Sequence, residues 1–141
     1  HIGAESWISR ENWTYTRALN LDYVPYYSLG VRFTHQISDG EHLQLHLMNG
    51  WQNMSENNDA KAFGLQYQRK LNEKWQVTYN NFLGDERITP GERGNFPTRF
   101  RGYHNFILRF LANEQWHYLA ALDFGHQAQT DNQGVDGWGA L

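Results

Sequence analysis

Histidines are the side chains in this sequence best suited to binding a metal ion, and there are seven of them. His42 and His46 share one face of an alternating segment, but four residues along a strand separate them by about 13 Å, which is too far to ligate one ion. The same lack of ligand spacing holds for His35, His104, His117 and His126. The chain has no cysteine, which excludes thiolate sites and disulfides. The sequence therefore predicts neither a metal nor another cofactor.

Carboxylates and arginines are mixed in the segment 85–102, where paired acids could perform general acid–base catalysis. The acids are Asp85, Glu86 and Glu92, and the arginines are Arg87, Arg93, Arg99 and Arg101. Mixed charges in a loop are more typical of a solvated surface. No G-x-S-x-G motif occurs, so no serine nucleophile is indicated either. These patterns favour a protein that is not an enzyme.

The element that must position any site is a β-hairpin over residues 63–83. Its first run places Phe63, Leu65 and Tyr67 on one face, with glycine and glutamines on the other. Its second run, after the turn L-N-E-K at 71–74, alternates in the same way, and strand side chains alternate with period two. The hairpin therefore has one apolar and one amide-rich face.

The same unit occurs three times between residues 27 and 126. Strands are predicted at 27–37, 42–48, 63–70, 75–83, 103–111 and 116–126, and the short turns between hairpin arms read I-S-D-G-E-H, L-N-E-K-W and L-A-N-E-Q-W. The other connections are long: residues 1–26, 49–61, 84–102 and 127–137, with the start of a seventh strand at 138–141. We treat the chain as a single β-barrel segment over residues 1–141.

This asymmetry of short turns and long loops is typical of outer-membrane β-barrels. Hydrophobic residues make up 40% of the chain and aromatic residues 16%, and rings gather near the strand ends, as they do at membrane interfaces. The mean hydropathy of −0.76 excludes a transmembrane helix but not a barrel with a polar lumen. The net charge of −3 gives no footprint for nucleic acid. We therefore expect an all-β, antiparallel up-and-down meander that forms part of a transmembrane β-barrel.

Several short motifs resemble the β-barrel porins of the OmpL-like type. They are P-Y-Y-S-L-G-V-R at 25–32, L-M-N-G-W-Q-N at 47–53, N-N-F-L-G-D-E at 80–86, A-L-D-F-G at 121–125 and the final W-G-A-L. The resemblance implies a porin in the outer membrane of a Gram-negative bacterium, without catalytic residues. Six strands and a stub are too few to close a barrel, so either the chain is an internal segment of a longer protein, which is the interpretation we favour, or closure needs other chains.

The expected function is passive diffusion of small hydrophilic solutes through a water-filled lumen. The expected partners are the lipid bilayer and those solutes, and the sequence leaves undecided whether the chain forms a homo-oligomer. The predicted lining consists of Arg32, Gln44, His46, Gln66, Gln68, Thr78, Asn80, Arg109 and Asp123. A second hypothesis folds the 85–102 loop inward, so that Arg87, Arg93, Arg99 and Arg101 constrict the pore and favour anions. The alternative is a soluble β-sandwich or lipocalin-like protein that binds carbohydrate or a small ligand through exposed aromatic rings.

Overall fold

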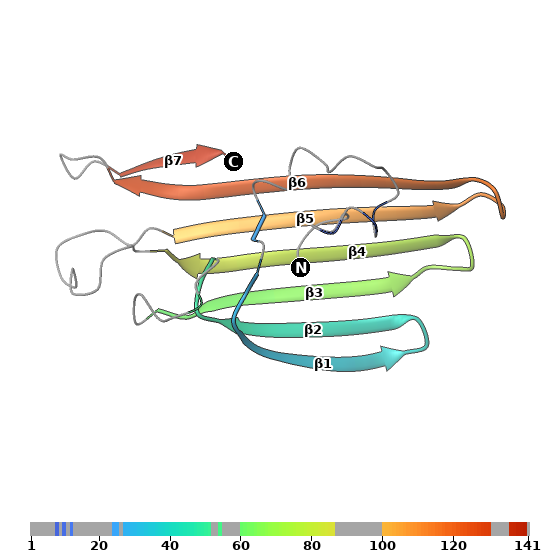
Figure 1. The fold of residues 1–141 in the computed structure, drawn as a ribbon, viewed down its shortest axis with the longest axis horizontal. Helices are drawn as coiled ribbons and strands as arrows, with labels where there is room; N and C mark the ends of the chain where they lie inside the picture. The colour runs from blue at the N-terminus through green and yellow to red at the C-terminus, as the bar shows by residue number, and fades with distance from the viewer. Residues whose placement is uncertain are drawn as a thin grey trace.

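The described part of the chain folds into seven β-strands and no helix longer than one turn (Figure 1). The computed structural model describes residues 8, 10, 12, 24–25, 27–51, 54, 60–86, 100–130 and 136–140. The strands are β1 (Gly30–Ser38), β2 (Glu41–Met48), β3 (Ala62–Lys70), β4 (Trp75–Asp85), β5 (Phe100–Leu111), β6 (His117–Thr130) and β7 (Asp136–Ala140). No helix among these residues is long and apolar enough to cross a membrane.

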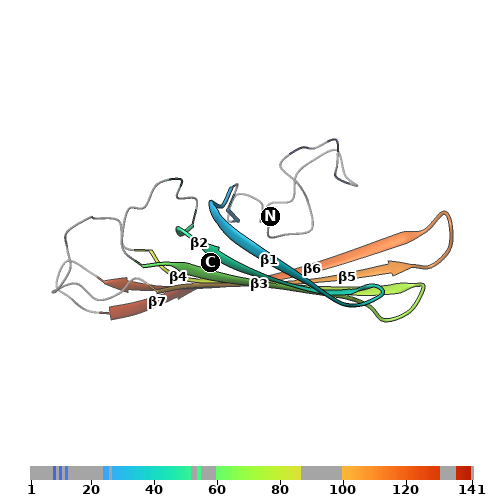
Figure 2. The ribbon, with the colours of Figure 1, turned by 90° about the horizontal axis from the view of Figure 1, so that it is seen from below.

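The strands form one antiparallel sheet in which spatial order follows chain order from β1 to β7. Seen from its edge, the sheet is a single layer, and β1 curls away from the plane of its neighbours (Figure 2). Within the described residues β1 and β7 each have one partner strand, so the sheet is open. The predicted all-β meander is therefore confirmed, while the second layer that a β-sandwich needs is missing from this part of the chain.

The three predicted hairpins are present, but several strand ends differ from the prediction. Strand β5 begins at Phe100 and β6 continues to Thr130, so the loops expected at 84–102 and 127–137 are shorter. The extension has a physical cause, because Phe100 pairs with Asp85 and Arg101 pairs with both Gly84 and Gln127. Most of the loops expected at 1–26 and 52–60 lie outside the described residues.

The short turns owe their shape to specific residues. Gly40 has a φ of 81°, the left-handed conformation that the Asp-Gly turn predicted. In the other two turns an asparagine oxygen accepts two backbone N–H groups: Asn72 Oδ1 from Lys74 and Trp75, and Asn113 Oδ1 from Gln115 and Trp116, at 2.9 Å each. The repeated N-E-x-W motif is thus one turn used twice.

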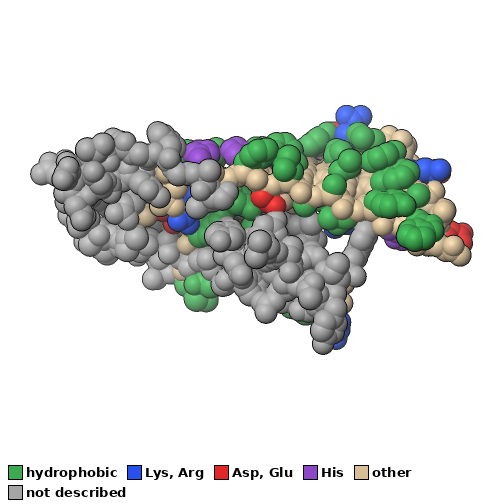
Figure 3. Space-filling model, turned by 90° about the horizontal axis from the view of Figure 1, so that it is seen from above, with side chains coloured by type: hydrophobic (Ala, Val, Ile, Leu, Met, Phe, Trp, Pro, Cys, Tyr) green, Lys and Arg blue, Asp and Glu red, His purple; other side chains and the backbone are tan. Residues whose placement is uncertain are grey.

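Register divides the sheet into two faces, because residues paired across antiparallel strands point the same way. The apolar face carries exposed hydrophobic side chains from β1, β2, β3, β5 and β6: Val31, Phe33, Leu45, Leu47, Phe63, Phe106, Leu108, Tyr118, Leu122 and Phe124. Hydrophobic side chains gather on the part of the sheet toward the short turns (Figure 3). The opposite, polar face is described below.

Candidate functional site

The polar face holds an open cleft of about 510 Å³ that brings together nearly all the predicted lining residues. Arg32, Gln44, His46, Gln66, Gln68, Thr78, Asn80 and Arg109 all border it. These side chains come from β1 to β5, and the register places them on one side because Arg32 pairs with His46 and Gln44 pairs with Gln66. Asp123, the ninth predicted residue, lies on the same face but does not border the cleft.

A ladder of side-chain hydrogen bonds crosses the polar face from β3 to β6. Gln66 donates to Asn80 at 2.6 Å, Asn80 donates to Asn105 at 2.8 Å, and Asn105 donates to the Asp123 carboxylate at 2.7 Å. Each bond joins residues that are direct partners in the sheet. The donors all point the same way, toward the one carboxylate, which fixes the orientation of every amide.

Asn105 is the member of this ladder that the predicted lining missed. Asn105 is 0% exposed and Asn80 is 3% exposed, so their amide groups depend on neighbouring side chains in the ladder for their hydrogen bonds. Alternation in the sequence places Asn105 on the polar face of its strand. Its role depends on the register between β4 and β5, which alternation alone does not give.

The basic side chains Arg32, His46 and Arg109 border the cleft. No carboxylate is among the described residues that border it. The described residues also contain no group of three or more His, Cys, Asp or Glu side chains that could hold a metal ion. The cleft can therefore offer amide, hydroxyl, imidazole and guanidinium groups to a solute.

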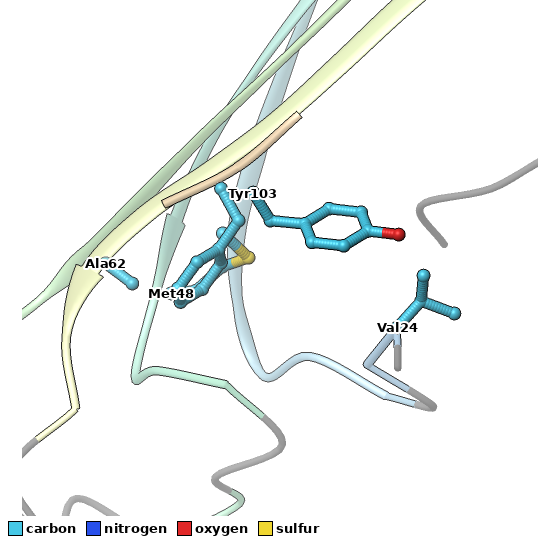
Figure 4. Close-up of a cluster of buried hydrophobic side chains, with 5 residues drawn as sticks. Val24, Met48, Ala62 and Tyr103 are labelled. Carbon is cyan, nitrogen blue, oxygen red and sulfur yellow. The ribbon is translucent and has the colours of Figure 1, made fainter. Parts of the chain in front are cut away.

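At the end of the polar face away from the short turns, a cluster of apolar side chains replaces the amides. Val24, Met48, Ala62, Phe82 and Tyr103 pack together there, and Trp51 packs against them; we call these six residues the mouth cluster. Val24 is only 1% exposed, although it lies outside the strands. Figure 4 shows the Tyr103 ring reaching from the sheet toward Val24.

Of the four arginines predicted to constrict the pore, only Arg101 is among the described residues, and its position differs from the prediction. Arg101 lies in β5 rather than in a loop, and its Nε and Nη2 donate to Gln127 Oε1 at 3.0 and 2.7 Å. Its guanidinium carbon lies 5.0 Å from the centre of the Trp51 ring, a cation–π contact. Arg87, Arg93 and Arg99 lie outside the described residues.

Glu86 follows the end of β4 and accepts a hydrogen bond from the Trp51 backbone N–H at 2.8 Å. Burial raises the pKa of this carboxyl above its ordinary value of 4.5, although the Trp51 hydrogen bond and the charge of Arg101 act in the opposite direction. This hydrogen bond thus connects the segment that follows β2, at Trp51, to the segment that follows β4, at Glu86.

One antiparallel meander with an apolar face, a polar face and short turns along one end defines the wall of a β-barrel. The chain belongs to the family described as "Putative beta-barrel porin-2, OmpL-like", whose model matches residues 1–140. This confirms the family that the short motifs resembled. Comparison with curated proteins and with solved structures gave no match.

Proposed function

We propose that this chain forms part of the wall of an outer-membrane porin, through which small hydrophilic solutes diffuse passively. The observation that carries the proposal is the division of one sheet into a face with exposed large hydrophobic side chains and a face with a polar cleft. In a barrel the first meets lipid and the second meets water. Membership of a porin family supports the same assignment.

Strand length and aromatic placement support a transmembrane position. Strand β4 has 11 residues, which gives a length of about 36 Å and, at a tilt of about 40°, a span of about 28 Å, close to the bilayer core. Near the short turns, three aromatic rings stack in a row on the apolar face. The ring centres of Trp75 and Phe110 are 4.2 Å apart, and those of Phe110 and Tyr118 are 6.0 Å apart. This row suits a membrane–water interface. By analogy with such barrels, the short turns face the periplasm of a Gram-negative bacterium.

Transport in this proposal involves no chemical step. The buried amides Asn80 and Asn105 hold Gln66 in place through hydrogen bonds along the wall, and Gln66, which borders the cleft and is not buried, keeps further hydrogen-bonding capacity for water or for a solute hydroxyl. Because the wall is already organised, water can exchange along it with little rearrangement.

We further propose that the lumen favours anionic solutes, because the charged groups that border the cleft are basic. Arginines in a pore raise the local concentration of anions and lower the barrier for their passage. Replacing Arg109 by Ala in the native full-length protein should shift the reversal potential in a salt gradient toward cation permeation.

Arg69→Ala is the matched control, because Arg69 pairs with Val77 on the apolar face and is exposed. It removes the same charge from outside the lumen and should leave the reversal potential where it was. An equal shift in both variants, or no shift in Arg109→Ala, would refute the preference for anions.

The assignment of the two faces can be tested by spin labelling of the full-length protein in lipid vesicles. Leu122→Cys carries a label on the apolar face, where Leu122 is 57% exposed, and Gln44→Cys carries one in the cleft. We expect lipid-soluble oxygen to reach the first label best, and a water-soluble nickel complex to reach the second best. A label at 122 that neither reagent reaches would mean that this face packs against protein.

A further inference from the structure

The polar face changes character between two neighbouring rows of the sheet. One row contains the amides Gln66, Asn80 and Asn105, whereas Phe82 and Tyr103 pair with each other only two residues further toward the mouth. On a wall that meets water, side chains such as these are expected to be polar. Here they are covered by Trp51 and Val24, which come from outside the strands.

Trp51 is held in place from several directions. Its ring makes edge contacts with Phe82 at 4.9 Å and Tyr103 at 5.4 Å between ring centres. Arg101 stacks on the ring, and Glu86 accepts the hydrogen bond of the Trp51 backbone. Arg101 is itself held by Gln127. A side chain fixed by this many contacts keeps one position, unlike the tip of a free loop.

The mouth cluster also lies next to the solute path. Met48 belongs to the cluster and borders the cleft as well, and Pro25, the neighbour of Val24, borders the cleft too. The cluster therefore stands between the polar cleft and the long connections, on the lumen side of the wall.

We propose that Trp51 forms the constriction of this pore at the mouth formed by the long connections, and that it sets the upper size of the solutes that pass. This inference rests on the proposed function and deepens it. A rigid apolar side chain packed on the lumen side of the wall narrows a water-filled path and disfavours water at that point. Small solutes then pass, while larger hydrated ones are rejected before they reach the arginines and amides of the cleft.

The test compares the native full-length protein with Trp51→Ala in planar bilayers, and in vesicles that swell when sugars of increasing size enter. We expect Trp51→Ala to raise the single-channel conductance and to admit sugars that the wild type excludes. Trp116→Ala is the matched control, since Trp116 is exposed next to a short turn at the opposite end of the sheet. It should leave both readings unchanged.

Trp51→Phe guards against a folding defect, because a smaller ring still fills part of the cluster. It should give a conductance and a size limit between those of the wild type and Trp51→Ala. If both Trp51 variants assemble normally and show the same single-channel conductance and the same size limit for sugars as the wild type, Trp51 only packs against the wall and the proposal is wrong. A wild-type protein that conducts nothing would instead overturn the porin function itself.

Discussion

The amide ladder allows the most detailed prediction, which concerns Asn105→Leu. Leucine has the same number of side-chain heavy atoms and a similar branched shape, but it cannot accept from Asn80 or donate to Asp123. A neutral hydrogen bond contributes about 1 kcal/mol and one to a carboxylate about 1.5–3 kcal/mol, while a buried donor left unpaired costs about 1–3 kcal/mol. Leucine regains part of this loss by apolar burial, so we expect a net destabilisation of about 2–4 kcal/mol.

The assay is urea unfolding of the full-length protein in lipid vesicles, followed by tryptophan fluorescence. Gln44→Leu is the control, because Gln44 lies on the same face of the sheet and its side chain makes no hydrogen bond to another described residue. It should change the free energy of unfolding by less than about 1 kcal/mol.

A double-mutant cycle identifies the ladder itself as the cause. Asn105→Leu and Asp123→Leu remove the same bond, so their combined effect should fall short of the sum by about 1 kcal/mol or more. Strict additivity, together with an Asn105→Leu effect no larger than that of Gln44→Leu, would refute the reasoning.

Three further predictions concern the turns, the mouth and the edge strand. Asn113→Ala loses two hydrogen bonds to backbone N–H groups, including that of Trp116, and should lower the free energy of unfolding by about 1–2 kcal/mol in the same urea assay; an unchanged midpoint would contradict the role of the asparagine. Burial raises the pKa of Glu86 because it favours the protonated carboxyl in the folded state. The stability that Glu86 contributes is therefore fully present below its unfolded-state pKa and is lost as the pH rises through its folded-state pKa. Glu86→Gln cannot ionise and should therefore gain stability relative to the wild type as the pH rises above the ordinary pKa of a glutamate, whereas a difference that is constant with pH would argue against the raised pKa. Gly30→Ala would place its Cβ 2.0 Å from the backbone oxygen of Leu47, so β1 should detach at that end, measured as faster amide hydrogen exchange there; unchanged exchange would contradict the close approach.

The hairpins could be predicted from the sequence because each depends on local signals. Alternation of side chains assigns the faces, and the Asp-Gly and Asn-Glu turns mark where the chain reverses, as Gly40 and Asn113 confirm. The lining residues followed from the same alternation. Most of them meet at one cleft because six strands keep a nearly regular register.

The parts that differed from prediction depend on contacts between distant segments. The sequence predicted a loop at 84–102, but pairing with the end of β4 draws Phe100 and Arg101 into β5. Trp51 follows a strand and resembles an interfacial ring in the sequence. Only the positions of Phe82 and Tyr103 across the sheet reveal that it turns onto the polar face.

The central claim is that the polar face lines a continuous water path across a membrane. The most direct test is planar-bilayer recording of the native full-length protein, purified in detergent. We expect stable ohmic conductance steps whose reversal potential in a salt gradient indicates anion preference. A protein that dissolves without detergent and adds no conductance to the bilayer would contradict it.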